Sequence, residues 1–343
     1  MRIGILTGGG DCPGLNAAIR AVVRRSIDVH GHEVYGIRDG WKGLVEGDVY
    51  QLSSSDMAGL IREGGTILGT SRTNPYNEEE DLKSLKENIK KFKFDAIVAI
   101  GGDDTLLVAT KLTEDGIPCV GIPKTIDNDL SATDATFGFD TALTIAVEAI
   151  DRLTTTAKSH HRTIVVEVMG RQAGWIALHA GIAGSAHCIM LPEFKMSVSE
   201  VVSLINKRKE AGKRFHIIVV SEGAAIGGDD SMVTQDESLD DFGNIRLGGV
   251  GKYVGKEIGK QTGDEIRTVV LGHTQRGGSP TAYDRMLATR FGLAAADYVN
   301  NGDFGKMAAL KGNEIVPVPL SDATSELKLV PAELYELAKT FFS

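Results

Sequence analysis

Three short glycine- or proline-led motifs carry most of the side chains that could do chemistry. They are Gly8–Asp11, Gly101–Thr105 and Pro123–Asp129. In the third motif Thr125, Asp127 and Asp129 are spaced two apart, so in an extended stretch they face the same side. One carboxylate would accept a proton from a hydroxyl, while its neighbour would bind a metal ion or maintain the geometry of the site. Lys124 would face an anion as a point charge. The alternative is a polar loop with an Asx turn.

Two adjacent aspartates, Asp103 and Asp104, follow a pair of glycines. Mg²⁺ is a hard cation that enzymes hold with one or two carboxylates plus substrate phosphates, so this pair predicts a magnesium site. The glycines of the first motif would let backbone N–H groups approach an anion. The alternatives are a helix cap for the aspartates and a plain turn for the glycines. The chain has neither a GxxxxGK[ST] string nor GxGxxG spacing.

Cationic side chains follow in later glycine-bearing segments. They are Arg162, Arg171, Arg267, His273 and Arg276. A guanidinium suits bidentate recognition of phosphate, although a single arginine is more often a surface residue. Together with the carboxylates, these residues predict magnesium-assisted transfer of a phosphoryl group to a hydroxyl on an anionic small molecule. Spacing alone names neither the donor nor the acceptor.

Short apolar strands that alternate with helices must position these motifs. We expect strands over 3–6, 34–37, 94–100, 119–122, 163–168, 187–191, 216–220 and 268–271. We expect helices over 15–29, 81–92, 106–113, 141–155, 173–183, 198–211 and 285–300. This alternation predicts parallel sheets, and ligands bind beyond the carboxyl ends of such strands. Residues 227–241 are acidic and without periodicity, which favours a surface loop.

Length and composition bound the class of protein. The chain has 343 residues, 42% hydrophobic, which is globular and long enough for two α/β domains. Its net charge of −9 disfavours a nucleic-acid partner but permits a local basic pocket. Cys12, Cys119 and Cys188 lack CxxC spacing and are expected in the core of a cytoplasmic protein. We expect no membrane span and no secretory signal, because no apolar run reaches 18 residues and the first residues favour a strand.

The strings that hold these motifs resemble the phosphofructokinase family from Gly4 to about Asn300. They are GILTGGGDCPGLNAAIR, GGDDT, PKTIDND, HHRTIVVEVMGRQAGWIAL, SEG and LGHTQRGGSP. The resemblance implies two doubly wound, three-layer α/β domains with the active site in the cleft between them. It also implies a homodimer or homotetramer that transfers a phosphoryl group to the 1-hydroxyl of fructose 6-phosphate, giving fructose 1,6-bisphosphate.

The resemblance assigns the catalytic roles. Asp127 matches the family's general base, and Thr125 flanks it. Asp103 matches the aspartate that binds Mg²⁺, the cofactor that the resemblance implies. Arg171 matches a sugar-side contact that also steadies the transferring group.

The resemblance also supplies the substrate-binding residues. They are Gly10, Arg72, Thr105, Asp129, Arg162, Met169, Gly170, Glu222, Arg267, His273 and Arg276. Within this set, Gly10 and Arg72 match contacts to the donor phosphates, and His273 with Arg276 matches the 6-phosphate site. Arg162 and Arg267 look like residues that a neighbouring subunit contributes, so the site would be complete only in an oligomer.

Two positions separate donor classes within the family, and we count both as catalytic. ATP-using members typically carry glycine where this chain has Asp104 and often where it has Lys124. Pyrophosphate-using members typically carry Asp followed later by Lys. A carboxylate at position 104 would repel the α-phosphate of a nucleotide, and Lys124 would offset the charge of pyrophosphate. The resemblance therefore implies reversible, pyrophosphate-dependent transfer in glycolysis or gluconeogenesis, with an ATP-dependent enzyme as the alternative.

Each of the two expected domains combines two segments of the chain. We assign 1–138 plus 251–304 to a donor-binding domain and 139–250 plus 305–343 to a fructose-6-phosphate-binding domain, with only structural packing for the tail.

Two other functions fit the sequence less well. A lipid or NAD kinase shares only the GGD element and lacks the TIDND, MGR and GHTQRGG strings. A non-catalytic phosphosugar sensor would lack one of the two key aspartates.

Effector control is not expected from this sequence. Arg20 and Arg24 match part of the basic effector site of bacterial ATP-dependent members. Thr154, His187 and Ala211, however, stand where that pattern has an arginine, a glutamate and a lysine.

Overall fold

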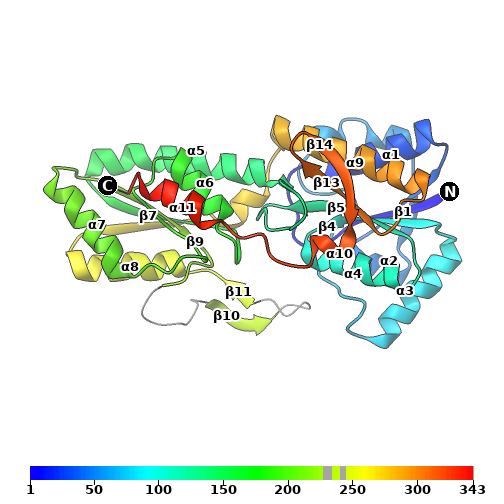
Figure 1. Ribbon diagram of the computed structural model, residues 1–343, viewed down its shortest axis with the longest axis horizontal. Helices are drawn as coiled ribbons and strands as arrows, with labels where there is room; N and C mark the ends of the chain where they lie inside the picture. Colours follow the sequence, from blue (N-terminus) through cyan, green and yellow to red (C-terminus); the bar gives the residue numbers. More distant parts are fainter. Residues whose placement is uncertain (227–233, 240–244, 343) are drawn as a thin grey trace.

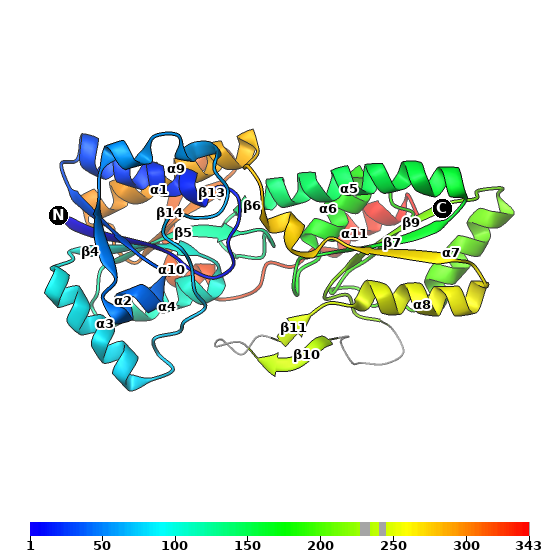
Figure 2. The ribbon, with the colours of Figure 1, turned by 180° about the vertical axis from the view of Figure 1, so that it is seen from behind.

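The computed structural model describes residues 1–226, 234–239 and 245–342, arranged as two α/β units that lie end to end (Figures 1 and 2). The first unit contains an eight-stranded sheet with the order β14-β13-β5-β4-β1-β2-β3, and β6 pairs with β5. The strands are β1 (Arg2–Thr7), β2 (Glu33–Ile37), β3 (Val49–Leu52), β4 (Ala96–Gly101), β5 (Cys119–Thr125), β6 (Phe137–Gly138), β13 (Lys306–Lys311) and β14 (Glu314–Pro319). The edge strands β3 and β14 pair antiparallel, and the strands between them run parallel.

Helices cover both faces of this sheet (Figure 1). One face carries α1 (Leu15–Arg24), its π-helical continuation η1 (Arg25–Val29) and α9 (Ala282–Asn301). The other carries α2 (Trp41–Glu46), α3 (Glu79–Phe92), α4 (Asp103–Glu114) and α10 (Leu320–Ala323). Two short 3₁₀ turns, η2 (Ser54–Met57) and η3 (Leu60–Arg62), follow β3.

The second unit has a four-stranded parallel sheet with the order β12-β7-β9-β8. Its strands are β7 (Thr163–Val168), β8 (Cys188–Met190), β9 (His216–Ser221) and β12 (Ile266–Val270). Its helices are α5 (Phe139–His160), α6 (Trp175–Ala183), α7 (Val198–Glu210), α8 (Val250–Thr262) and α11 (Ala332–Lys339). A hairpin of β10 (Thr234–Leu239) and β11 (Ile245–Leu247) and the 3₁₀ turn η4 (Gly272–Arg276) complete the described elements.

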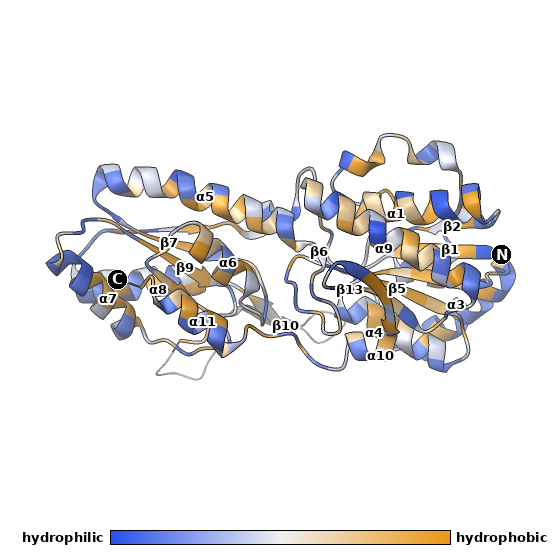
Figure 3. Cartoon of the chain, turned by 45° about the horizontal axis from the view of Figure 1, so that its top comes forward, coloured by the Kyte–Doolittle hydropathy of each residue, from blue (hydrophilic) through white to orange (hydrophobic). Residues whose placement is uncertain are grey.

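The strand sequences explain why helices cover both faces. In β1, Ile3 and Ile5 pack into one hydrophobic core and Leu6 into the core on the other face. In β4, Val98 and Ala99 divide in the same way. Successive strand residues point to opposite faces, so a strand that is apolar at every position needs a layer on each side. Figure 3 shows the strands as mostly hydrophobic and the long helices as alternately hydrophobic and hydrophilic.

Every strand and helix expected from the sequence is present, with ends that differ by a few residues. The expected loop at 227–241 lies mostly outside the described residues, and 234–239 within it forms β10. Among the described helices, none has the length and apolar composition to cross a membrane.

The two large sheets divide the chain differently from the expected domain boundaries. Residues 251–304 include α8 and β12, yet β12 pairs with β7 of the second sheet. Residues 305–343 include β13 and β14, yet β13 pairs with β5 of the first sheet. Both differences arise from pairing between distant segments, which leaves no composition shift at the crossing points. The tail after 305 therefore builds an edge of the first sheet rather than only packing on the second unit.

Candidate active site

A polar cleft lies where the carboxyl ends of three adjacent parallel strands meet. The loops after β1, β4 and β5 come together because these strands are neighbours in the first sheet. The second unit contributes two arginines from the loops after β7 and β12. The cleft is lined by Gly9, Gly10, Arg72, Gly102, Asp103, Asp104, Thr105, Lys124, Thr125, Asp127, Arg171 and Arg276. Residues predicted from three separate motifs and from the later arginines thus share one cleft.

The loop after β1 is open enough for an arginine to approach its backbone. Gly9 has a φ of 75°, in the left-handed region that favours glycine, and its N–H donates to the Ser71 carbonyl at 3.0 Å. The Arg276 guanidinium occupies the space where a side chain on Gly10 would stand, and it donates to the Asp11 carbonyl at 3.2 Å. The first motif is therefore more than a plain turn, because it brings a cation of the second unit against the first.

The loop after β4 presents two carboxylates from the first turn of α4. Gly102 is the N-cap residue of α4, and no side chain makes a capping hydrogen bond there. Asp103 and Asp104 are thus not the caps of this helix. Thr105 is buried, and a Cβ on Gly8 would lie 2.5 Å from its Oγ1. This close packing holds the start of α4 beside the loop after β1.

The loop after β5 buries a lysine and the expected base together. Lys124 Nζ donates to the Gly10 carbonyl at 2.5 Å, and burial lowers the pKa of Lys124. The Asp127 backbone N–H donates to Thr125 Oγ1 at 3.0 Å, so the hydroxyl closes the loop. Burial raises the pKa of Asp127, and the charges of Arg276 and Arg171 counteract this.

One oxygen of Asp127 is left open. Asp127 Oδ1 is buried and has no hydrogen-bond partner among the described residues. A buried carboxylate oxygen is normally hydrogen-bonded, so an open one in a cleft is a position for a substrate group. Its raised pKa brings this carboxyl closer to the working range of a general base.

Asp129 is buried near the cleft rather than in its lining. β5 ends at Thr125, and Asn128 has a φ of 54°, so the stretch is not extended throughout as the sequence pattern suggests. Burial, with the charges of Asp127 and Asp103, raises the pKa of Asp129 to about 8. This carboxyl therefore resists ionisation in the folded chain.

The second unit joins the cleft through the ends of β7, β9 and β12. Met169 N–H donates to Gln275 Oε1 at 2.9 Å, and Arg171 N–H donates to Glu222 Oε1 at 3.1 Å. Arg171 has a φ of 51°, an unfavourable conformation for a non-glycine residue that Glu222 helps to hold. Gly170, between them, has a φ of 142°. Burial raises the pKa of Glu222 to about 7.

Three expected sugar-phosphate residues lie away from the cleft lining. His273, in η4, is exposed. Arg162 precedes β7 and Arg267 lies near the start of β12, at the end of the sheet opposite to Arg171. A six-residue strand spans about 20 Å. Arg162 forms an ion pair with Glu265 at 3.0 Å, and Arg267 pairs with the same carboxylate. Within one chain these two arginines do not join the cleft.

The donor set of the cleft fits Mg²⁺ bound together with a phosphate. Among the described residues, no group of three or more His, Cys, Asp and Glu side chains is arranged to hold a metal ion alone. Mg²⁺ commonly uses one or two carboxylates, with substrate phosphates and water for the remaining positions. Asp103, in the lining of the cleft, supplies a carboxylate donor of this kind.

Two residues at the site have no assigned role in the sequence analysis. Gln275 lies within the LGHTQRGGSP string, and its contact to Met169 depends on the pairing of β7 with β12. Lys328 lies far along the chain from the cleft motifs, yet its Nζ donates to Asn128 Oδ1 at 3.0 Å. No local pattern in the sequence marks either contact.

The family of the chain follows from comparison with known proteins. The profile of the family described as Phosphofructokinase matches residues 2–299. A pyrophosphate--fructose 6-phosphate 1-phosphotransferase of Amycolatopsis methanolica is 59% identical over the whole of both chains. An ATP-dependent 6-phosphofructokinase 3 of Streptomyces coelicolor is 50% identical, covering 99% of each chain. The chain belongs to the phosphofructokinase family.

A solved structure confirms the fold. The structure of phosphofructokinase from Saccharomyces cerevisiae superposes with a TM-score of 0.82 at 32% identity. The match covers 99% of this chain and 46% of the yeast chain, so this chain spans less than half the length of that one.

Replacing Asp129 by asparagine is expected to stabilise the fold. An acid whose pKa is raised on folding lowers stability as pH rises from about 4, its unfolded pKa, to its folded pKa. With a folded pKa of about 8, the difference in Tm between Asp129→Asn and wild type should be small near pH 5 and grow to about 2 °C or more near pH 8. Calorimetry without ligands measures it. A variant that is less stable at pH 8 than at pH 5, relative to wild type, would contradict the pKa direction.

Proposed function

We propose that the chain transfers a phosphoryl group reversibly from pyrophosphate to the 1-hydroxyl of fructose 6-phosphate. The observation that carries the proposal is that Asp104 and Lys124 line the same cleft as Asp127. The name of the 59% identical relative supports pyrophosphate as donor. The 50% identical ATP-dependent relative keeps ATP as the second candidate. Glycolysis and gluconeogenesis are the pathways that this reaction would serve.

Proton transfer is the task of Asp127. Its open, buried oxygen accepts the proton of the sugar hydroxyl as the phosphoryl group arrives. Arg171 and Arg276, from the second unit, place positive charge at the cleft where negative charge spreads over the transferring group. Mg²⁺, when bound beside Asp103, supplies neutralisation of the phosphate oxygens.

The donor side of the cleft is small and strongly charged. Pyrophosphate needs space for two phosphates, whereas ATP must also place an α-phosphate, a ribose and an adenine. Lys124 is already held at the Gly10 carbonyl, beside the backbone that faces the donor. Asp104 lines the same cleft, and a carboxylate near an α-phosphate is repulsive where water is scarce.

The sugar phosphate would be held in part by a second copy of the chain. His273, in η4, is exposed, and Arg276 lines the cleft. Arg162 and Arg267, at the opposite end of the second sheet, would reach the site of a neighbouring subunit in a homodimer or homotetramer. The ion pairs of both arginines with Glu265 would then compete with the sugar phosphate.

Asp127→Asn should abolish most turnover. The substitution keeps the shape of the side chain and removes its basicity, so kcat should fall by about 10²–10⁴-fold in both directions while KM for fructose 6-phosphate changes little. Steady-state assays with pyrophosphate and Mg²⁺ measure both constants. Asp151→Asn, an exposed aspartate on α5, is the control and should behave as wild type. Near-normal turnover in Asp127→Asn would refute the assignment of the base.

Donor choice should depend on Asp104 and Lys124. Wild type should use pyrophosphate far better than ATP. Asp104→Gly should open the donor side and weaken the pyrophosphate reaction, and adding Lys124→Gly should shift the preference further toward ATP. The measurement is kcat/KM for both donors in wild type, the single variant and the double variant. A wild-type preference for ATP, or an unchanged donor ratio in Asp104→Gly, would show that the proposed discrimination is wrong.

Effectors should have little influence on the kinetics. Thr154 Oγ1 donates to the Ile150 carbonyl, His187 Nδ1 accepts from the Ile217 N–H, and burial lowers the pKa of His187 to about 4. These side chains are thus occupied or neutral near pH 7. We expect hyperbolic dependence on fructose 6-phosphate, nearly unchanged by ADP or phosphoenolpyruvate. Sigmoidal kinetics that ADP relieves would contradict this expectation.

A further inference from the structure

The segment after α10 crosses from the first unit to the second beside the loop between β5 and β6, residues 126–136, which we call the catalytic loop. We call residues 324–331 the C-terminal strap; Figure 1 shows this part of the chain running between α10 and α11. Leu327 forms a β-bridge with Leu130, and the Lys328 N–H donates to the Asp129 carbonyl at 2.9 Å. The strap therefore adds backbone pairing to the loop that follows Asp127.

The same strap is bound by the second unit. Trp175 Nε1, at the start of α6, donates to the Lys328 carbonyl at 2.7 Å. The Val330 N–H donates to Glu193 Oε1 at 3.0 Å, and that oxygen also accepts from the Gly174 N–H at 2.9 Å. One residue, Lys328, thus contacts the catalytic loop through its N–H and the second unit through its carbonyl.

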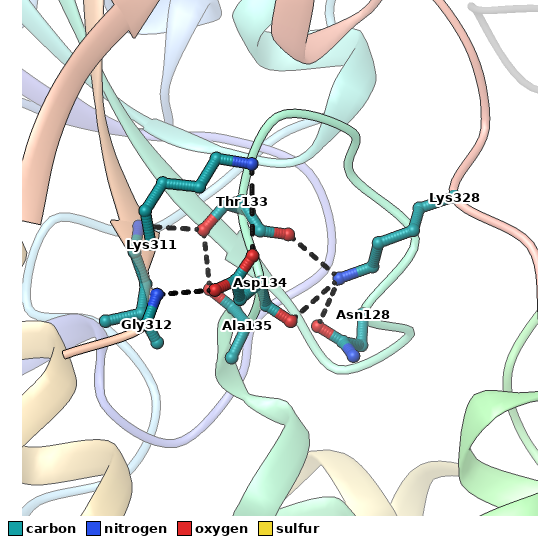
Figure 4. A network of polar contacts seen from close by, with 8 residues as sticks. Asn128, Thr133, Asp134, Ala135, Lys311, Gly312 and Lys328 are labelled. Carbon is teal, nitrogen blue, oxygen red and sulfur yellow. Dashed lines mark hydrogen bonds and ion pairs between the residues drawn. The ribbon is translucent and has the colours of Figure 1, made fainter. Parts of the chain in front are cut away.

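The Lys328 side chain uses all three of its donors on the catalytic loop. Nζ donates to Asn128 Oδ1 at 3.0 Å and to the carbonyls of Thr133 and Asp134, each at 3.1 Å (Figure 4). The Trp175 ring centroid lies 5.6 Å from the same ammonium. An ammonium has three N–H donors and no acceptor, so this arrangement is complete.

Asn128 is the residue through which this ammonium affects the cleft. It lies between Asp127 and Asp129, and its φ of 54° lies in the left-handed region, which asparagine adopts more readily than most non-glycine residues. Asn128 Oδ1 also accepts from the buried Thr136 N–H at 3.2 Å. Two donors on one amide oxygen hold the side chain, and the side chain holds the turn that directs Asp127 into the cleft.

We propose that Lys328 is a positioning residue for phosphoryl transfer, which fixes the turn at Asn128 and ties it to the second unit. The inference rests on the proposed function, since it assigns Lys328 a task in that reaction. A displacement of a reacting group by about 1 Å can cost 10²-fold in rate, so loss of these three bonds is enough to affect catalysis.

The protonation state of Lys328 should make turnover depend on pH. Burial lowers its pKa to about 8, with Asp129 and Asp134 raising it and Lys311 lowering it. Burial lowers the pKa of His179, on α6, and the charge of Lys328 lowers it further. A neutral amine has two N–H donors, so one of the three bonds to the loop is lost as pH rises through this value. Turnover should then fall on the alkaline side.

The test uses the full chain with Mg²⁺, fructose 6-phosphate and pyrophosphate. Lys328→Met keeps length and removes the donors, and we expect kcat to fall by about 10²-fold with KM for both substrates nearly unchanged. In an Asp127→Asn background the same substitution should add little, because the group that it positions is already gone. Lys311→Met is the matched control: Lys311 is exposed, forms an ion pair with the Asp134 carboxylate at 3.8 Å, and its substitution should leave kcat at the wild-type value.

Lys328→Arg keeps the test decisive if Lys328→Met fails to fold. A guanidinium does not deprotonate in this range, so the alkaline fall of kcat near pH 8 should disappear while the acidic limb stays. Wild-type kcat in Lys328→Met, an equal loss in the Asp127→Asn background, or an unchanged alkaline limb in Lys328→Arg would overturn the proposal. An inactive wild type with pyrophosphate and fructose 6-phosphate would instead refute the proposed function, which separates the two failures.

Discussion

Carboxylates on one side of the cleft face arginines on the other, and this charge balance restricts how the two sheets are placed. The first sheet places buried Asp127 with Asp103 at one side, and the second sheet places Arg171 and Arg276 at the other. A buried carboxylate without a cation nearby is costly, and the two arginines lower that cost for Asp127. The same arginines come from loops whose strands belong to the other unit. Electrostatic balance at the site therefore favours one relative placement of the two sheets.

Parallel sheet geometry explains how residues so far apart in the sequence reach this balance. β5, β4 and β1 are adjacent, as are β12, β7 and β9, and most residues that line the cleft lie at or just after the carboxyl ends of these strands. Arg72 instead lies between η3 and α3. Strand sequences that are mostly apolar require helices on both faces, so the polar groups of the cleft gather at the strand ends. Polar groups buried elsewhere have partners of their own, such as Glu167 in β7, whose carboxylate accepts from the N–H groups of Gly249 and Gly251.

This geometry also decides what the sequence could predict. The ends of β1 and β4 were predictable to within one residue because each apolar run stops at a glycine-rich motif, whereas β5 continues through Pro123 to Thr125, three residues beyond its expected end. The position of β13 beside β5 was not, because pairing between residues so far apart has no local signal. The direction of Asp129 was not predictable either, since it depends on the left-handed backbone of Asn128. Lys328 was missed for the same reason as β13.

The chain crosses between the units three times within its described part, and each crossing lies beside a site residue. The first follows β6 into α5, the second follows Arg276 into α9, and the third is the C-terminal strap. At the first two, buried Asp284 on α9 accepts hydrogen bonds from the N–H and Oγ1 of Thr141 on α5. A rotation of one unit against the other would strain these bonds and those of Lys328, and it would also move Arg171 relative to Asp127. The same connections between the units therefore set the position of the two arginines and the geometry of Asp127. The cleft is a single site whose two sides are held in place together.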